Sequence, residues 1–445
     1  MQRWPVLLAV LFCVLAASGL ASAGGAGEGI SFVTAWGSPG SGDGQFRTPN
    51  GIAVDDRGDV YVVDSENNRI EKFSATGRFL GKWGRNGGDG SAGSGDGEFN
   101  FPYGVAADGW GNVYVADGRN NRIQKFTSDG KFLAKWGRNG GDGSAGTGDG
   151  EFNNPRGVTT DVFGNVYVAD HGNNRIEKFA RDGRFLRKWG RNGGDGSAGS
   201  GNGEFDQPRG LAVGARGRIY VAEKRNHRIQ ELGADGTFLR KWGRNGGDGT
   251  PGNGDGEFNL PYGVAVARNG HVFVADTLNN RIQEFTASGQ FVAKLGRNGG
   301  DGSAGSGTGE FNAVYGIAVD CRSGVYATDD ENNRVQRFGA GSTAAARCPP
   351  TLTLIGGPAR RIRHGRVAIS ARCDRPCAVR IAITSSARSG RRVRSAPIAR
   401  TLPPATTVAI AFRVPSRAAK LTLVATASGF GGRSAPVRRE VRIAR

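Results

Sequence analysis

The chain has 445 residues and a formal net charge of +19, because 59 lysines and arginines outnumber 40 aspartates and glutamates. The excess lies in residues 347–445, where 21 basic residues stand against two acidic ones. The rest of the chain is neutral, which argues against nucleic-acid binding through bulk charge. After residue 23 no apolar run reaches the roughly 18 residues that a spanning helix needs, which excludes a helical membrane protein.

The first 23 residues have the composition of a secretory signal peptide. Arg3 supplies the positive start, Val6 to Leu15 form the apolar stretch, and Ala21-Ser22-Ala23 is a small-residue cleavage site. A short membrane anchor is the alternative, but the apolar stretch is too short to span a bilayer. We expect cleavage near Ala23 and a protein that is secreted or associated with the cell envelope.

Residues 28–340 are built from a unit that recurs every 53 residues. Each unit contains four short runs rich in Val, Ile, Tyr and Phe, separated by Gly, Asn and Asp turns, a pattern that predicts β-strands. Four strands per unit are typical of a propeller blade. The sixth unit stops after Phe338 without a fourth strand, whereas Phe32 to Gly37 matches a fourth strand that has no unit before it. We therefore expect the N-terminal strand to complete a ring of six blades and hide the sheet edges, with an open solenoid as the alternative.

An acidic residue followed five positions later by arginine marks every unit. The acid ends the second strand and the arginine begins the third, so their hairpin should bring them together as an ion pair or as a clamp on loop carbonyls. Because the pair is the same in every blade, we interpret it as structural, since an active site in a ring needs different residues from different blades. The twelve residues are Asp64, Arg69, Asp117, Arg122, Asp170, Arg175, Glu223, Arg228, Asp276, Arg281, Asp329 and Arg334.

The connections between units are long and rich in glycine. Four begin with Trp-Gly-Arg-Asn-Gly-Gly-Asp-Gly, a fifth has Leu295 instead of Trp, and the N-terminal copy is six residues shorter. Long loops are where binding residues concentrate, so we expect a candidate binding face here. Calcium would be the cofactor suited to Asp and Gly oxygens, but no EF-hand or β-roll spacing is present, and the alternative is a loop that bonds only to itself and needs no cofactor. The residues of this face are Arg85, Asp89, Arg138, Asp142, Arg191, Asp195, Arg244, Asp248, Arg297 and Asp301.

Three motifs in the units resemble the NHL repeat family of six-bladed propellers. They are Pro-x-Gly-(Ile/Val)-Ala-Val, Gly-Asn-Val-Tyr-Val-Ala-Asp and Asn-Asn-Arg-Ile-Gln-(Lys/Glu)-Phe, and the resemblance covers about Gly29 to Gly339. It implies an all-β propeller that serves as a binding platform, although the fold alone does not fix a function. Some relatives are amidating lyases and some animal relatives bind RNA, but the neutral charge and the expected export disfavour RNA here.

An enzyme on this scaffold would need metal ligands from several blades around the central channel. The repeats contain only His171, His227 and His271, which stand at different positions of their units, so a three-histidine zinc site is not predicted. No Ser-His-Asp or Cys-His signature is present either. A secreted lactonase- or lyase-like metal enzyme is the alternative to a binding protein.

Four cysteines remain after the signal peptide, an even number that predicts two disulfides among three connectivities. We favour Cys321–Cys348, which would tie the sixth unit to the segment that leaves it. The second pair would then be Cys373–Cys377, a local clasp. A metal site would need a second matching Cys pair, which the sequence lacks.

Residues 351–445 form a separate module by composition, joined to the propeller by a linker at 341–350. Alternating β runs, such as 379–383 and 408–412, predict a small β-sandwich of immunoglobulin-like plan. Its arginines could be a solvated surface, or they could attach the protein to anionic envelope polymers. We predict a non-enzymatic, exported propeller that binds a protein or glycan partner, while this basic module provides attachment; nucleic acid is not an expected partner.

Overall fold

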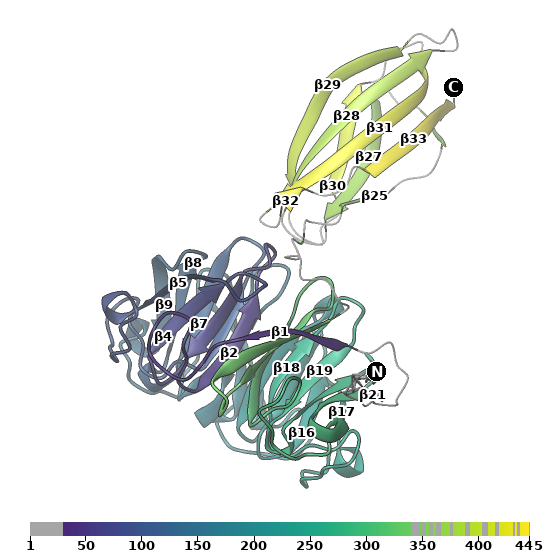
Figure 1. Cartoon of the computed structure of the whole chain (residues 1–445). Helices are drawn as coiled ribbons and strands as arrows, with labels where there is room; N and C mark the ends of the chain where they lie inside the picture. The colour runs from purple at the N-terminus through teal and green to yellow at the C-terminus, as the bar shows by residue number, and fades with distance from the viewer. Residues whose placement is uncertain are drawn as a thin grey trace, which may run out of the picture.

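The computed structural model describes residues 30–339, Cys348 and the strands between residues 352 and 444. The predicted signal peptide, 1–23, and the linker apart from Cys348 lie outside the described residues. Six four-stranded antiparallel sheets form the blades of a propeller around a central channel (Figure 1). The prediction of an all-β, six-bladed propeller is therefore confirmed.

Each blade has four strands, which follow one another from the channel to the rim. The innermost strands are β2 (Pro49–Val54), β6 (Gly104–Ala107), β10 (Pro155–Thr160), β14 (Pro208–Val213), β18 (Pro261–Val266) and β22 (Val314–Val319). The second strands are β3 (Val60–Asp64), β7 (Asn112–Asp117), β11 (Val166–Asp170), β15 (Ile219–Glu223), β19 (Val272–Asp276) and β23 (Val325–Asp329). The third strands are β4 (Arg69–Phe73), β8 (Arg122–Thr127), β12 (Arg175–Phe179), β16 (Arg228–Leu232), β20 (Arg281–Phe285) and β24 (Arg334–Gly339). The outer strands are β5 (Phe79–Gly84), β9 (Phe132–Gly137), β13 (Phe185–Gly190), β17 (Phe238–Gly243), β21 (Phe291–Gly296) and β1 (Ser31–Trp36).

The hydrophobic core lies between the blades. Val113 and Val115 of β7 are buried because neighbouring blades cover the sheet that contains them. Trp83 of blade one packs against Phe126 of blade two, with 6.0 Å between the ring centroids. Gly130 lies against this indole ring, and a Cβ there would come within 2.8 Å of it. Similar apolar clusters join every pair of adjacent blades, so the ring is held together by side-chain packing between sheets.

The N-terminal strand closes the ring. β1 pairs antiparallel with β24, from Ser31 opposite Gly339 to Trp36 opposite Val335, and the purple strand lies beside the green strands of blade six (Figure 1). The Trp36 ring packs on Phe73 of blade one, with 5.9 Å between the centroids. The junction of the last and first blades is thus packed like the other five, as the missing strand of the sixth unit predicted.

The structure pairs Cys321 with Cys348 and Cys373 with Cys377, as predicted. The backbone N–H of Cys348 also donates to the carbonyl oxygen of Asp56 at 2.6 Å. Cys321 and Asp56 lie in the turns that follow the innermost strands of blades six and one. Cys348 is therefore held at the end of the propeller where the innermost strands finish.

The strands after Cys348 form two sheets, described separately from the propeller. One contains β25 (Leu352–Ile355), β27 (Arg366–Cys373) and β30 (Val408–Arg413). The other contains β26 (Ala359–Arg361), β33 (Val437–Ala444), β31 (Ala418–Gly429), β28 (Cys377–Ala387) and β29 (Arg392–Leu402), with β32 (Gly432–Arg433) paired to β31. The immunoglobulin-like sandwich stays a prediction. Among the described residues of the whole chain, no helix is both long and apolar enough to cross a membrane.

Candidate functional site

The acid–arginine pairs lie between the strands and the loops, fully buried in blades one to five and with a partly exposed arginine, Arg334, in blade six. In blade two, Arg122 Nε donates to Asp117 Oδ2 at 2.8 Å. The two Nη atoms of Arg122 donate to the carbonyl oxygens of Ser94, Gly95 and Glu98 in the loop that arrives from blade one. The other five pairs have the same Nε-to-carboxylate contact, at 2.7 to 2.8 Å. Each pair therefore fixes an inter-blade loop and leaves little of its polar surface for a ligand.

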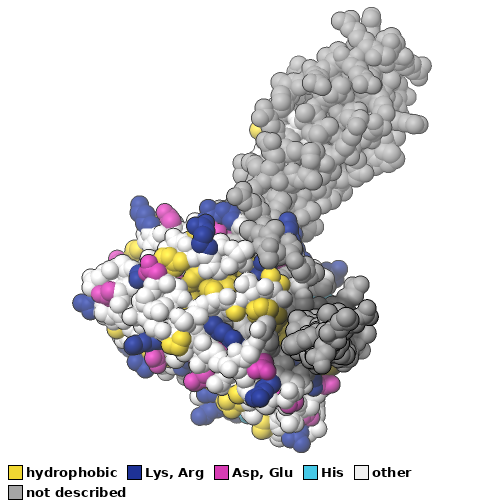
Figure 2. Space-filling model, in the orientation of Figure 1, with side chains coloured by type: hydrophobic (Ala, Val, Ile, Leu, Met, Phe, Trp, Pro, Cys, Tyr) yellow, Lys and Arg dark blue, Asp and Glu magenta, His cyan; other side chains and the backbone are white. Residues whose placement is uncertain are grey.

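The exposed Arg and Asp residues of the long loops bond within their own loops. Asp89 accepts hydrogen bonds from the Ser91 hydroxyl at 2.6 Å, the Ser91 backbone at 2.8 Å and Asn86 at 3.0 Å, and these donors hold the pKa of the Asp89 carboxyl below its usual range. Arg85 donates to the carbonyl of Ala92 at 2.8 Å. The other four loops repeat these contacts. Because these carboxylates already have donors, we propose no metal there. Figure 2 shows charges of both signs interspersed over the visible face of the propeller.

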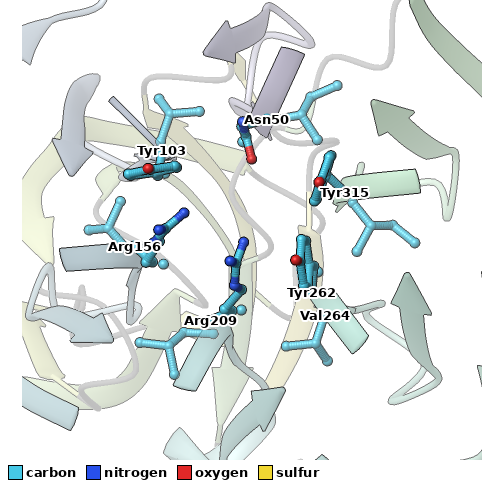
Figure 3. A pocket seen from close by; sticks show the side chains of 18 residues that line it. Asn50, Tyr103, Arg156, Arg209, Tyr262, Val264 and Tyr315 are labelled. Carbon is cyan, nitrogen blue, oxygen red and sulfur yellow. The ribbon is translucent and has the colours of Figure 1, made fainter. Parts of the chain in front are cut away.

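Six side chains, one from each blade, line the mouth of the central channel (Figure 3). They occupy the middle position of the Pro-x-Gly motif at the start of each innermost strand, where Val replaces Pro in blade six. A Cβ on Gly104 of this motif would lie 2.1 Å from the carbonyl oxygen of Arg156, so the glycine lets adjacent innermost strands approach. The space in the mouth that the centres of water-sized molecules can occupy is about 90 Å³, so the mouth holds one small group of a ligand and not a whole large one. The six mouth residues are Asn50, Tyr103, Arg156, Arg209, Tyr262 and Tyr315.

Arg156 and Arg209 extend side by side into the mouth (Figure 3). The Arg156 Cζ atom lies 3.5 Å from the centre of the Tyr103 ring, and the Arg209 Cζ atom lies 3.7 Å from the centre of the Tyr262 ring. Such stacking holds a guanidinium group in place and leaves its N–H edges free to donate. Among the described residues, the Nε atoms of both arginines are buried without a hydrogen-bond partner, and neither arginine forms an ion pair.

Burial and mutual repulsion make these two charges unfavourable without a ligand. Burial, and after it the positive charge of Arg209, lowers the pKa of Arg156 to about 10. Burial also lowers the pKa of Arg209. Arg156 therefore stays protonated at neutral pH, as does Arg209, because an arginine side chain rarely loses its proton. Two unpaired guanidinium groups in one cavity favour an anion, since a carboxylate, sulfate or phosphate can accept from both.

The remaining mouth residues are hydrogen-bonding side chains. The rings of Tyr262 and Tyr315 stack with 4.5 Å between centroids and 23° between planes, so Arg209, Tyr262 and Tyr315 form one continuous stack. Burial raises the pKa of the Tyr315 hydroxyl, which therefore remains a donor. Asn50 contributes an amide from blade one (Figure 3). The mouth thus combines two cations with uncharged polar groups, and none of its six side chains is an acid.

The three histidines of the repeats do not converge. His171 Nδ1 lies 3.3 Å from the carbonyl oxygen of Pro208, and burial lowers the pKa of His171 to about 3, so it is neutral. His227 accepts a hydrogen bond from the backbone of the next blade. His271 follows an innermost strand, at the far end from the mouth, and pairs with Glu284 at 2.6 Å. In the part of the chain that the structure describes, no three His, Cys, Asp or Glu residues are grouped so that they could hold a metal ion.

The mouth residues differ from the loop residues that the sequence pointed to. The loops begin at the outer strands, whereas the mouth is formed by the variable residue of Pro-x-Gly. One signal in the sequence could have found it: this position holds Asn, Tyr, Arg, Arg, Tyr and Tyr in turn, inside a motif that is otherwise nearly constant. A position that breaks the repeat at the channel is where a ring of similar blades can acquire an asymmetric site.

Comparison with curated proteins gives partial matches over the repeats. Human NHL repeat-containing protein 3 is 41% identical over 96 residues, which are 21% of this chain and 26% of that protein. A probable peptidyl-alpha-hydroxyglycine alpha-amidating lyase of Caenorhabditis elegans is 32% identical over 153 residues, which are 34% of this chain and 42% of that protein. The chain therefore spans less than half of the length of these relatives. Virginiamycin B lyase from Staphylococcus aureus, a solved structure, is 17% identical, with a TM-score of 0.44 over 66% of this chain and 95% of that one.

The family model of the NHL repeat matches five segments of the chain, at residues 46–73, 99–126, 152–179, 205–232 and 258–285. Each segment contains the three inner strands of one blade, from blade one to blade five. In blade six, residues 311–338 form the same three strands. The matches and the six blades together identify this chain as an NHL-repeat protein whose repeats build a six-bladed propeller.

Proposed function

We propose that the propeller is a non-enzymatic binding module that holds an anionic group of its ligand at the channel mouth. The observation that carries this proposal is the pair Arg156 and Arg209, two stacked guanidinium groups without an acidic partner among the described residues. The six mouth side chains include neither a carboxylate nor a histidine; of the groups that interact with them, burial keeps His171 neutral and raises the pKa of Asp330 to about 8. A metal-dependent lyase or lactonase would need a ligand cluster that the described residues do not supply.

We further propose that the protein acts outside the cell, with a protein or glycan as its partner. The signal-like composition of residues 1–23 supports export. The two disulfides fit an oxidising compartment. An exported propeller with an anion site would meet acidic glycans or acidic proteins at the cell surface.

Calorimetry with D-galacturonate, using uncharged D-galactose for comparison, tests the anion site in the full chain. The double variant R156A/R209A is expected to bind galacturonate at least tenfold more weakly, because charge-assisted hydrogen bonds contribute about 1.5–3 kcal/mol each. The matched control R138A/R191A removes two exposed loop arginines and should bind like the unmodified protein. Equal affinity for the acid and the neutral sugar, or no effect of R156A/R209A, would count against the proposal.

Residues beyond 350 are proposed to attach the protein to anionic surfaces. The full chain should sediment with phosphatidylglycerol vesicles at low salt and be released as the salt concentration rises, because the attraction is a screened charge interaction. A chain ending at residue 350 should bind these vesicles much more weakly, since residues 347–445 hold the whole charge excess. If the shortened chain co-sediments as well as the full chain, these arginines are only a solvated surface.

A further inference from the structure

A third unpaired arginine lies at the rim of the mouth, in blade two. Arg119 is exposed in the short 3-10 turn η2 (Gly118–Asn120), and its Cζ atom lies 4.4 Å from the centre of the Phe101 ring. The Phe101 ring packs on Tyr103 with 5.2 Å between the centroids, and the other stacking partner of Tyr103 is Arg156 at 3.5 Å. The Phe101 and Tyr103 ring planes are tilted by 52°, so Arg119, Phe101, Tyr103 and Arg156 form one chain of side-chain contacts from the exposed rim into the mouth.

Among the six described blades, only blade two has this chain of aromatic contacts. Phe101 has a φ of +50°, a left-handed conformation that is unusual for a bulky side chain. All six blades have a positive φ at this position, but only blade two places an aromatic ring there. The conformation therefore belongs to the turn in every blade, and the aromatic ring is what distinguishes blade two. The equivalent residues of the other five blades are Thr48, Asn154, Gln207, Leu260 and Ala313.

Arg119 adds a positive charge at the rim, outside the pair Arg156 and Arg209. Within the described residues Arg119 forms no ion pair, so its charge is available. Two aromatic rings, Phe101 and Tyr103, link Arg119 to Arg156 through successive contacts, so Arg119 offers a charge apart from the Arg156 and Arg209 pair. A ligand that contacts Arg119 as well as Arg156 and Arg209 would carry anionic groups at intervals along a chain.

The uncharged polar groups of the mouth indicate which class of anionic ligand fits best. Tyr262, Tyr315 and Asn50 line the mouth with the two arginines (Figure 3), and the Asn50 amide nitrogen already donates to the Ser65 hydroxyl at 2.9 Å, which leaves the two tyrosine hydroxyls and the Asn50 carbonyl. A sugar ring presents several hydroxyl groups around its acid group, whereas the carboxylate of an acidic peptide is surrounded by methylene groups. Buried polar groups need partners when a ligand displaces water, so the mouth fits an acidic sugar better than an acidic side chain.

We propose that the ligand is an oligosaccharide of acidic sugars, with one carboxylate between Arg156 and Arg209 and a neighbouring acidic unit at Arg119. This inference rests on the proposed anion site and adds the class and the minimum length of the ligand. The chain of the ligand crosses the edge of the mouth over blade two, along the adjoining rings of Phe101 and Tyr103.

The test is calorimetry of the full chain with galacturonic acid and its dimer and trimer at physiological salt. The unmodified protein should bind the trimer at least tenfold more tightly than the monomer. R119A should lose most of that gain and keep its affinity for the monomer within about twofold, because Arg119 lies outside the mouth. F101N should behave similarly, since Asn tolerates the positive φ and removes the ring.

Arg225, the exposed arginine at the equivalent position of blade four, supplies the matched control, and R225A should retain the full gain with chain length. If R119A still binds the trimer at least tenfold more tightly than the monomer, the extended site is wrong, but the anion site at Arg156 and Arg209 is unaffected. A triglutamate peptide or a trinucleotide that shows the same Arg119-dependent gain overturns the assignment to acidic sugars. If the unmodified protein binds none of the galacturonates, both this inference and the anion site for acidic sugars fail.

Discussion

Replacing Arg122 by alanine is expected to lower the free energy of unfolding by about 3–5 kcal/mol, because removal of one partner leaves a buried charge uncompensated. Asp117 is fully buried and would lose its ion pair. The carbonyl oxygens of Ser94, Gly95 and Glu98 would lose their donors in the same substitution. Urea denaturation followed by tryptophan fluorescence measures the change, since inter-blade tryptophans report on the packing of the ring.

Arg85 supplies the control for this prediction. It also belongs to a recurring arginine position and lies 3.7 Å from a carboxylate oxygen of Glu98, but about half of its side chain is exposed. R85A should therefore change the free energy of unfolding by less than about 1 kcal/mol. If R122A and R85A had equal effects, the buried pairs would not be what fixes the loops, and the structural interpretation of the acid–arginine repeat would be wrong.

Replacing Glu71 and Glu177 by glutamine is expected to stabilise the protein at alkaline pH. Both side chains are fully buried, and burial raises the pKa of each to about 8. One carboxyl oxygen of each lacks a hydrogen-bond partner among the described residues. At this position the other four blades have glutamine; in blade two the Gln124 amide donates to Glu98 at 2.6 Å and to Asp117 at 3.1 Å. A glutamate can replace that donor only while it holds a proton.

The direction of the pH dependence follows from the raised pKa. Each buried Glu supports folding fully below its ordinary pKa of 4.5, and this support is lost as the pH rises from 4.5 to about 8. E71Q/E177Q should therefore resemble the unmodified protein near pH 4.5 and exceed it at pH 8, by up to about 4 kcal/mol for each residue. Denaturation at a series of pH values measures the difference. The reverse variant Q283E should acquire the same alkaline sensitivity in blade five, whereas a benefit of E71Q/E177Q that does not vary with pH would show that protonation is not its cause.

The repeat made the fold predictable from the sequence, down to the strand that closes the ring. A period of 53 residues fixes the number of blades, and the missing strand after Phe338 together with the spare one before Gly37 fixes the closure. The disulfide between Cys321 and Cys348 was predictable because so few cysteines remain outside the signal peptide. These features depend on local sequence patterns and on the number of strands and cysteines, both of which can be read directly from the sequence.

The channel mouth was not predicted, because it depends on contacts between residues far apart in the chain. Arg156 and Arg209 are 53 residues apart, and only the curvature of the closed ring brings their side chains together. Within the sequence of a single blade, nothing distinguishes Arg156 or Arg209 from an ordinary exposed arginine. The long loops were predicted to form the binding face because they are long, charged and nearly constant. In the structure, hydrogen bonds within each loop occupy most of their Asp and Arg side chains. In a repeat protein, the positions that vary around the axis identify the site better than those that recur.

The position of Cys348 determines which end of the channel lies next to the segment that leaves the propeller. Its disulfide to Cys321 and its hydrogen bond to Asp56 lie where the innermost strands end, whereas Arg156 and Arg209 lie near where such strands begin. The chain that continues from Cys348 is therefore anchored at the end of the channel opposite the mouth. If residues beyond 350 attach the protein to a surface, as proposed, the mouths of neighbouring copies would face the medium, and a crowded layer would offer many parallel openings to one long ligand.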